Sequence, residues 1–134
     1  MKSPNNNMDT TLLDNMIVGR VEPYIYAFST ETVPNYLKVG DTWRGVRVRL
    51  AEWKKIFPNL IKQYEHTDQI DEETIFRDYS VHTFLKREKK RIQLQPNTFP
   101  DLHYYSNEFF KDTSRKDLDE AIADIFQSAR DNNG

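Results

Sequence analysis

Several side chains that can move a proton or stabilise negative charge stand at positions that a fold can bring together. Tyr26 and Lys38 each occupy the middle of a short β-like run, and Arg49 borders the apolar stripe of a helical segment. Asp78 lies four residues before His82 on one helical face. Hydrolysis of a phosphodiester requires a base for water, cations for the developing charge and usually a metal held by carboxylate oxygen. These residue types make that chemistry a hypothesis worth testing.

Each of these residues also has a purely structural interpretation. A tyrosine in a strand commonly packs in the core, and Arg49 can simply pair with Glu52 or Asp41. Asp78 and His82 can form a structural hydrogen-bonded pair. A carboxylate on an apolar helix face costs free energy unless a metal or an arginine compensates it. Taken singly, the residues leave both interpretations open.

The sequence disfavours several other classes of enzyme. It has no Cys, so disulfides, thiolate zinc sites and cysteine nucleophiles are excluded. None of its four Gly forms a phosphate-binding loop of the GxGxxG or GxxxxGKS type. Its three His are scattered and form no zinc motif, and no GxSxG nucleophile elbow is present. Dehydrogenases, kinases, zinc hydrolases and thiol enzymes are therefore poor matches.

The length and composition indicate one globular domain. The chain has 134 residues, of which 37% are hydrophobic and 13% aromatic, enough to bury a core. No apolar run reaches the length of a transmembrane helix or of a signal-peptide core. We expect a tail or short helix over residues 1–20 and a domain over residues 21–130. We also expect a soluble cytoplasmic protein without membrane contact or disulfides.

The charges are unevenly distributed along the chain. The formal net charge is −2, although a protein that coats nucleic acid is usually basic. A mildly acidic protein can still offer one basic face to phosphates. Solvated surface is the equally acceptable alternative. The residues that we expect to contact DNA are Arg44, Arg47, Lys54 and Lys55.

The sequence pattern predicts an α+β domain with a small, mostly antiparallel sheet. Aromatic and β-branched residues predict strands over 24–28 and 36–40, and weaker alternation predicts a third over 60–66. Apolar residues at helical spacing predict a helix over 46–57 that Pro58 ends. The acidic run 71–73 predicts the start of a second helix that ends near Arg87. A short strand within 104–110 and a helix from about Ser114, with Asp117 in a capping box, complete the order.

The order of these motifs resembles the GIY-YIG endonuclease superfamily over residues 22–126. The resemblance is to its phage- and restriction-associated branch, in which the second motif commonly reads KIG. Two positions differ from the family motifs. Tyr24 stands where the GIY motif has its glycine, and Lys38 stands where the YIG motif has its tyrosine. The matching segments are Tyr24-Ile25-Tyr26, Lys38-Val39-Gly40 with Thr42 two residues on, Arg49-Leu50, Asp78 with His82, and Glu108-Phe109-Phe110.

The resemblance implies a three-stranded antiparallel sheet flanked by helices and metal-dependent cleavage of DNA. It implies that Tyr26 works as, or helps, the base on water and that Arg49 stabilises the phosphate. Asp78 would hold a single Mg²⁺ or Mn²⁺, in place of the family's usual and longer Glu. Lys38 would place positive charge near the phosphate. His82 and Thr42 match as supporting residues.

The resemblance also implies a partner and a context. The partner is DNA, and the domain would be a module of a restriction or DNA-processing protein, with helicase or restriction domains in a longer chain. Asp78 is one methylene shorter than the family's Glu, and Glu73 is a fallback ligand. The alternative function is a catalytically weak or inactive DNA-binding or protein-interaction module on the same fold.

Overall fold

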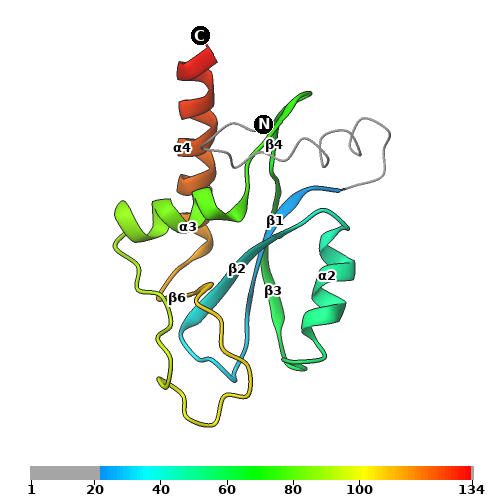
Figure 1. The fold of residues 1–134 in the computed structure, drawn as a ribbon, viewed down its shortest axis with the longest axis vertical. Coiled ribbons are helices and arrows are strands. Elements are labelled where there is room, and N and C mark those ends of the chain that lie inside the picture. The colour runs from blue at the N-terminus through cyan, green and yellow to red at the C-terminus, as the bar shows by residue number, and fades with distance from the viewer. Residues whose placement is uncertain (1–21, 134) are drawn as a thin grey trace.

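A four-stranded antiparallel sheet forms the centre of the molecule (Figure 1). The computed structural model describes residues 22–133, so the tail or short helix expected over residues 1–20 lies outside the described residues. The strand order is β3-β1-β2-β6, and a separate hairpin pairs β4 with β5. The strands are β1 Tyr24–Ser29, β2 Tyr36–Thr42, β3 Ile61–Thr67, β4 Gln69–Asp71, β5 Thr74–Ile75 and β6 Phe109–Lys111. The helices are α2 Val46–Trp53, α3 Asp78–Arg87 and α4 Arg115–Asn133.

The α+β class is confirmed, but the sheet has four strands where the resemblance implied three. The additional strand, β6, occupies the end of the segment in which a short strand was predicted. It pairs with β2 from Tyr36 opposite Lys111 to Lys38 opposite Phe109. Phe109 and Phe110 are fully buried on opposite sides of the sheet, and this burial gives the short strand its stability.

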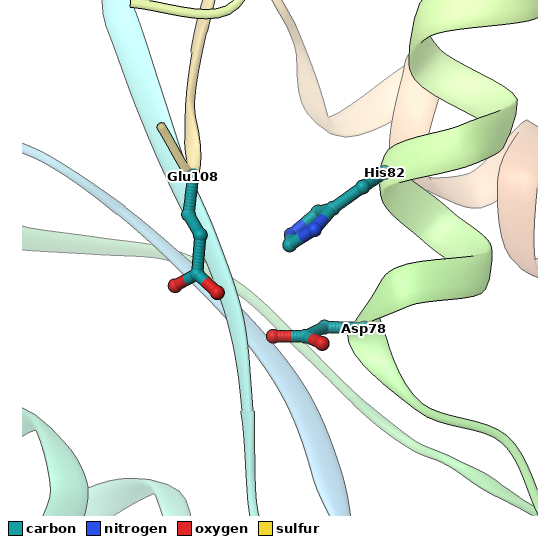
Figure 2. A group of neighbouring side chains, drawn as sticks. All are labelled: Asp78, His82 and Glu108. Carbon is teal, nitrogen blue, oxygen red and sulfur yellow. The ribbon is translucent and has the colours of Figure 1, made fainter. Parts of the chain in front are cut away.

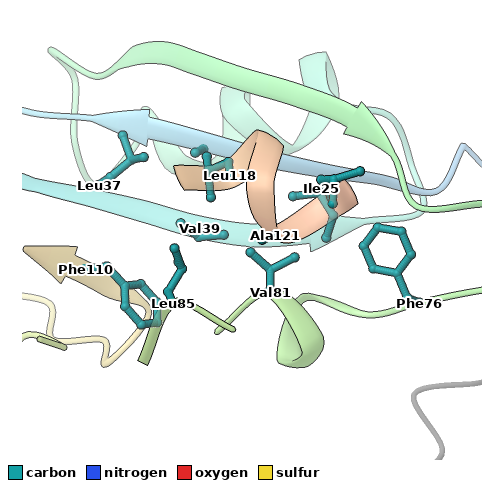
Figure 3. Close-up of a cluster of buried hydrophobic side chains, with 11 residues drawn as sticks. Ile25, Leu37, Val39, Phe76, Val81, Leu85, Phe110, Leu118 and Ala121 are labelled. Carbon is teal, nitrogen blue, oxygen red and sulfur yellow. The ribbon is translucent and has the colours of Figure 1, made fainter. Parts of the chain in front are cut away.

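Helices cover both faces of the sheet and create two hydrophobic cores. Alternation along β1 sends Ile25 and Ala27 to one face and Tyr26 and Phe28 to the other. The first face packs against α3 and α4, as Figure 3 shows. The second face packs against α2. Tyr26 therefore lies in the core beneath α2, whereas α3 approaches the sheet from the opposite side.

The helix predicted from the acidic run 71–73 is wrong in its first half. Those residues instead belong to the β4–β5 hairpin, in which the Asp71 carboxylate accepts a hydrogen bond from the Glu73 amide at 2.8 Å. An aspartate can satisfy a turn amide as readily as a helix terminus, and this sequence pattern fits both structures. The helix begins at Asp78, one strand and a turn later. Glu73 is consequently not on a helix.

The other two helices were predicted more closely. The α2 helix ends at Trp53, before the Phe57 that was expected to close it, although Phe57 remains buried. The capping box at the start of α4 is confirmed. The Ser114 amide donates to Asp117 Oδ2 at 3.0 Å, and the Asp117 amide donates to Ser114 Oγ at 3.3 Å. Among the described residues, no helix combines the length and hydrophobicity needed to cross a membrane.

Candidate active site

The candidate site lies beside the edge of β2, where both β6 and α3 begin. Pairing between β2 and β6 ends at Lys38, and the first turn of α3 is fixed to the next part of β2. The Asp78 amide donates to Asp41 Oδ2 at 3.0 Å. The His82 Nε2 lies 2.8 Å from the carbonyl oxygen of Val39. Two hydrogen bonds thus hold the acidic end of α3 beside the sheet.

Tyr26 places its hydroxyl inside this region from the neighbouring strand. Its side chain is only 1% exposed, and its Oη accepts a hydrogen bond from Trp53 Nε1 at 2.7 Å. Burial raises the pKa of Tyr26 to about 12, against the opposing effects of Trp53 and Arg49. Tyr26 is therefore a protonated phenol at neutral pH.

Gly40 makes room for Tyr26 and Lys38. It lies directly opposite Tyr26 in the β1–β2 pairing. A Cβ on Gly40 would lie 2.8 Å from Tyr26 Oη and 3.1 Å from Lys38 Nζ, closer than Cβ atoms normally come to other heavy atoms. The absence of a side chain at Gly40 therefore allows the phenol and the ammonium to occupy the same space above β2.

Lys38 is a buried cation with one acidic partner. Its Nζ lies 2.7 Å from Glu108 Oε1 and 4.4 Å from the centre of the Trp53 ring. Burial lowers the pKa of Lys38, while the charge and hydrogen bond of Glu108 act in the opposite direction. Glu108 lies immediately before β6. The sequence identified it only as part of the Glu108-Phe109-Phe110 motif and not as a site residue.

Arg49 reaches the same group from α2. Its guanidinium carbon lies 4.7 Å from the centre of the Trp53 ring, where a cation is attracted to the aromatic face. Its Nη1 also pairs with Glu52 Oε1 at 2.8 Å. This is one of the two ion pairs that the structural interpretation of Arg49 predicted. Asp41, the other partner predicted for Arg49, pairs with Arg77 instead, at 2.7 Å. No ion pair between Arg49 and Asp41 is present among residues 22–133.

Asp78, His82 and Glu108 converge from α3 and the start of β6 (Figure 2). One ligand-type atom from each residue lies within 4.8 Å of the others. A carbonyl oxygen can only accept a hydrogen bond, so His82 Nε2 must be the donor to Val39 and the Nδ1 lone pair stays available. Burial also lowers the pKa of His82, which keeps its ring neutral.

The charge at Asp78 is poorly compensated. Burial, together with the negative charges of the nearby carboxylates Asp41 and Glu108, raises the pKa of Asp78 to about 7. Lys38 and Arg77 oppose this shift without overcoming it. A carboxylate whose ionisation is disfavoured by burial and by other acids is stabilised by an added cation. Asp78 and Glu108 supply carboxylate oxygens of the kind that Mg²⁺ and Mn²⁺ prefer, and the neutral His82 adds an imidazole nitrogen, a donor more typical of transition metals than of Mg²⁺.

The sequence-predicted site residues thus form two groups that meet at one ion pair. Tyr26, Lys38 and Arg49 surround the Trp53 ring, whereas Asp78 and His82 gather near Glu108. The Lys38–Glu108 pair connects the groups. Sequence reasoning missed Glu108 as a ligand candidate because only the pairing of β6 with β2 brings it here.

The remaining predicted residues lie around this centre. Thr42 is buried at the end of β2, where its Oγ1 accepts the Arg44 amide hydrogen bond at 3.1 Å. Arg44 binds the Glu52 carboxylate through both terminal nitrogens, at 2.7 and 2.8 Å. The other three basic residues expected to contact DNA, Arg47, Lys54 and Lys55, are exposed on or just after α2.

Comparison of the chain with protein-family models, curated proteins and solved structures gave no match.

Proposed function

We propose that this protein is a metal-dependent endonuclease that hydrolyses phosphodiester bonds in DNA, as its sequence resemblance implies. One observation carries the proposal: the Lys38–Glu108 pair joins a cationic group to a group of metal-ligand type. Phosphodiester hydrolysis needs both kinds of group within reach of one phosphate. Nothing in the order of the motifs alone requires their side chains to converge in this way.

Asp78, His82 and Glu108 would hold the divalent cation. His82 would contribute Nδ1, and Glu108 would contribute the carboxylate oxygen that is not bonded to Lys38. When bound, the cation would supply Lewis-acid stabilisation of the phosphate and would lower the pKa of a water molecule. The shorter reach of Asp78 is compensated in this assignment, because Glu108 provides a second acidic ligand.

Lys38 and Arg49 would stabilise the negative charge that develops on the phosphate. Both cations lie against the Trp53 ring, and the indole excludes water from one side of each. Tyr26, with its pKa raised to about 12, is protonated at neutral pH. We therefore assign its hydroxyl the role of orienting the attacking water by hydrogen bonding. The resemblance implies that Tyr26 is the base or assists the base, and this assignment makes it the assisting group.

A second candidate function is a DNA-binding module without cleavage. One observation favours it: Glu52 already pairs with both Arg44 and Arg49, so two of the expected phosphate ligands are satisfied within the protein. Phosphate binding by Arg49 requires that Glu52 release it or share it. Exposed ion pairs of this type are weak, about 0–1 kcal/mol, so a phosphate can compete with Glu52.

Nicking of supercoiled plasmid separates these two functions. We expect the protein to convert plasmid to the open circular form in Mg²⁺ or Mn²⁺ and to lose this activity in EDTA. A folded protein that shifts DNA in a gel, with affinity that falls steeply with salt, but never nicks it is the binding module. A protein that neither binds nor nicks DNA has neither function.

A further inference from the structure

A pocket of about 270 Å³ lies beside the candidate active site and shares Arg49 with it, while the rest of its lining has no role in the proposed chemistry. Its walls include Arg49 and Arg44 from the α2 side, Trp43 from the end of β2, and Asp68. A flat ring system fits such a volume, whereas most drug-sized ligands occupy more, in pockets of roughly 300–1,000 Å³.

Asp68 is a buried residue in the wall of this pocket, and one of its two carboxyl oxygens has no hydrogen-bond partner among the described residues. Its residue is 2% exposed, and its Oδ1 has no hydrogen-bond partner among residues 22–133. Its backbone is held on both sides, since its amide donates to Pro23 at 3.2 Å and its carbonyl accepts from Phe76 at 2.9 Å. An unpartnered buried carboxyl costs about 1–3 kcal/mol, and a ligand that hydrogen-bonds to it recovers that free energy.

Trp43 gives the same pocket an aromatic surface. Its side chain is 42% exposed although it lines the pocket, and Arg77 lies against its ring at 6.0 Å from the centroid. Exposed aromatic rings beside basic residues are the usual platform for unstacked bases in single-stranded nucleic acid. Trp43 therefore offers a stacking surface within the same pocket as the Asp68 carboxyl.

We propose that this pocket binds one unstacked nucleobase of the DNA strand, with the base stacked on Trp43 and its edge hydrogen-bonded to Asp68. The inference rests on the proposed function, because Arg49 and Arg44 on the pocket wall would hold the phosphate that adjoins this base. The pocket would then select the nucleotide next to the bond that is cut.

The chemistry of Asp68 suits a base edge. Burial raises the pKa of Asp68 to about 8, so its carboxyl carries a proton at neutral pH. A carboxylic acid presents a donor beside an acceptor, and each base edge presents an N–H beside a ring nitrogen or a carbonyl. The arginines of the wall can bind a phosphate, but only a base can also stack on the Trp43 ring, so the pocket fits a nucleotide better than a free anion.

The test measures binding of the four deoxynucleoside monophosphates by the NMR shift of the Trp43 indole N–H. We expect at least one of them to shift this signal, and Asp68→Leu to weaken its binding about tenfold or more. Asp68→Asn keeps a donor and an acceptor and should retain binding. Asp101→Asn, an exposed position in a distant loop, is the matched control and should change nothing. Asp68→Leu should fold, because it removes an unsatisfied polar group.

Cleavage mapping provides the second arm and separates this inference from the proposed function. If the protein nicks DNA, Trp43→Ala and Asp68→Leu should change which nucleotide adjoins the cut. Unchanged cut positions together with an unmoved Trp43 signal overturn the pocket assignment while the nuclease stands. The protein can also give Trp43 shifts that depend on the base and that Asp68→Leu abolishes, and yet never nick DNA. That result supports base binding in the pocket and overturns the proposed nuclease activity.

Discussion

Lys38 Nζ lies 2.7 Å from Glu108 Oε1, and this contact joins residues that are 70 positions apart in the sequence. It forms because β6 pairs with β2 only as far as Lys38, which leaves Glu108 just beyond the last paired residue. The lysine is almost completely buried, whereas the glutamate remains partly exposed. One carboxylate thereby neutralises a buried cation and faces Asp78 and His82.

The loss of Glu108 should destabilise the protein through Lys38. Glu108→Ala leaves a buried ammonium without its partner, which should lower the free energy of unfolding by about 1–3 kcal/mol. Urea denaturation measures this change. The Lys38→Met background provides the control, because Glu108→Ala should cost clearly less there. Equal losses in both backgrounds would show that the pair contributes no coupling energy.

A methyl group at Gly40 should disturb the site more than the fold. Gly40→Ala places a Cβ 2.8 Å from Tyr26 Oη, so the phenol must move. A displacement of this kind can reduce a reaction rate about a hundredfold, and we expect a loss of that order in plasmid nicking. Adding Tyr26→Phe to Gly40→Ala removes the clashing oxygen and should recover part of the melting temperature. If Gly40→Ala nicks at the wild-type rate, the site does not depend on this phenol.

The removal of Arg49 should reduce cleavage with little loss of stability. Arg49→Ala removes a cation proposed to act on the phosphate, and the loss of one such stabilising group commonly costs about 10²–10³ in rate. The pair between Arg49 and Glu52 is partly exposed, so the melting temperature should change little. Arg130→Ala, an equal change of charge at an exposed position on α4, is the control and should nick normally. Equal nicking by both variants would remove Arg49 from the mechanism.

Asp68 should make the protein less stable as the pH rises. Its pKa is raised from 3.8 to about 8 in the folded protein, so the folded state binds more protons than the unfolded state between these values. The free energy of unfolding should therefore fall with rising pH in this window, by up to about 1.4 kcal/mol per unit. Thermal unfolding at pH 5 to 8 measures the slope, which Asp68→Asn should reduce, leaving the part that the raised pKa of Asp78 contributes. A slope that Asp68→Asn leaves unchanged would place the titration elsewhere.

The sequence allowed the prediction of those features that depend on local pattern. Alternation placed Tyr26 and Lys38 within paired strands, and the short spacing of Ser114 and Asp117 identified a helix cap. The acidic run 71–73 failed as a helix start because an aspartate serves a turn equally well. Glu108 and Asp68 could not be assigned, since their roles depend on tertiary neighbours. No local pattern shows that β6 begins beside Lys38, or that Asp68 Oδ1 has no hydrogen-bond partner within residues 22–133.

The proposed mechanism requires Asp78 to help hold a divalent cation that is needed for cleavage. The most direct test is the rate of plasmid nicking as Mn²⁺ is increased, compared between the wild-type protein, Asp78→Asn and Asp124→Asn. Asp124 is exposed on α4 and provides a matched change of charge away from the site. We predict metal-dependent nicking by the wild-type protein and by Asp124→Asn, and a loss of nicking at every Mn²⁺ concentration in folded Asp78→Asn. Nicking by Asp78→Asn with the wild-type Mn²⁺ dependence would show that Asp78 does not hold a metal ion needed for cleavage.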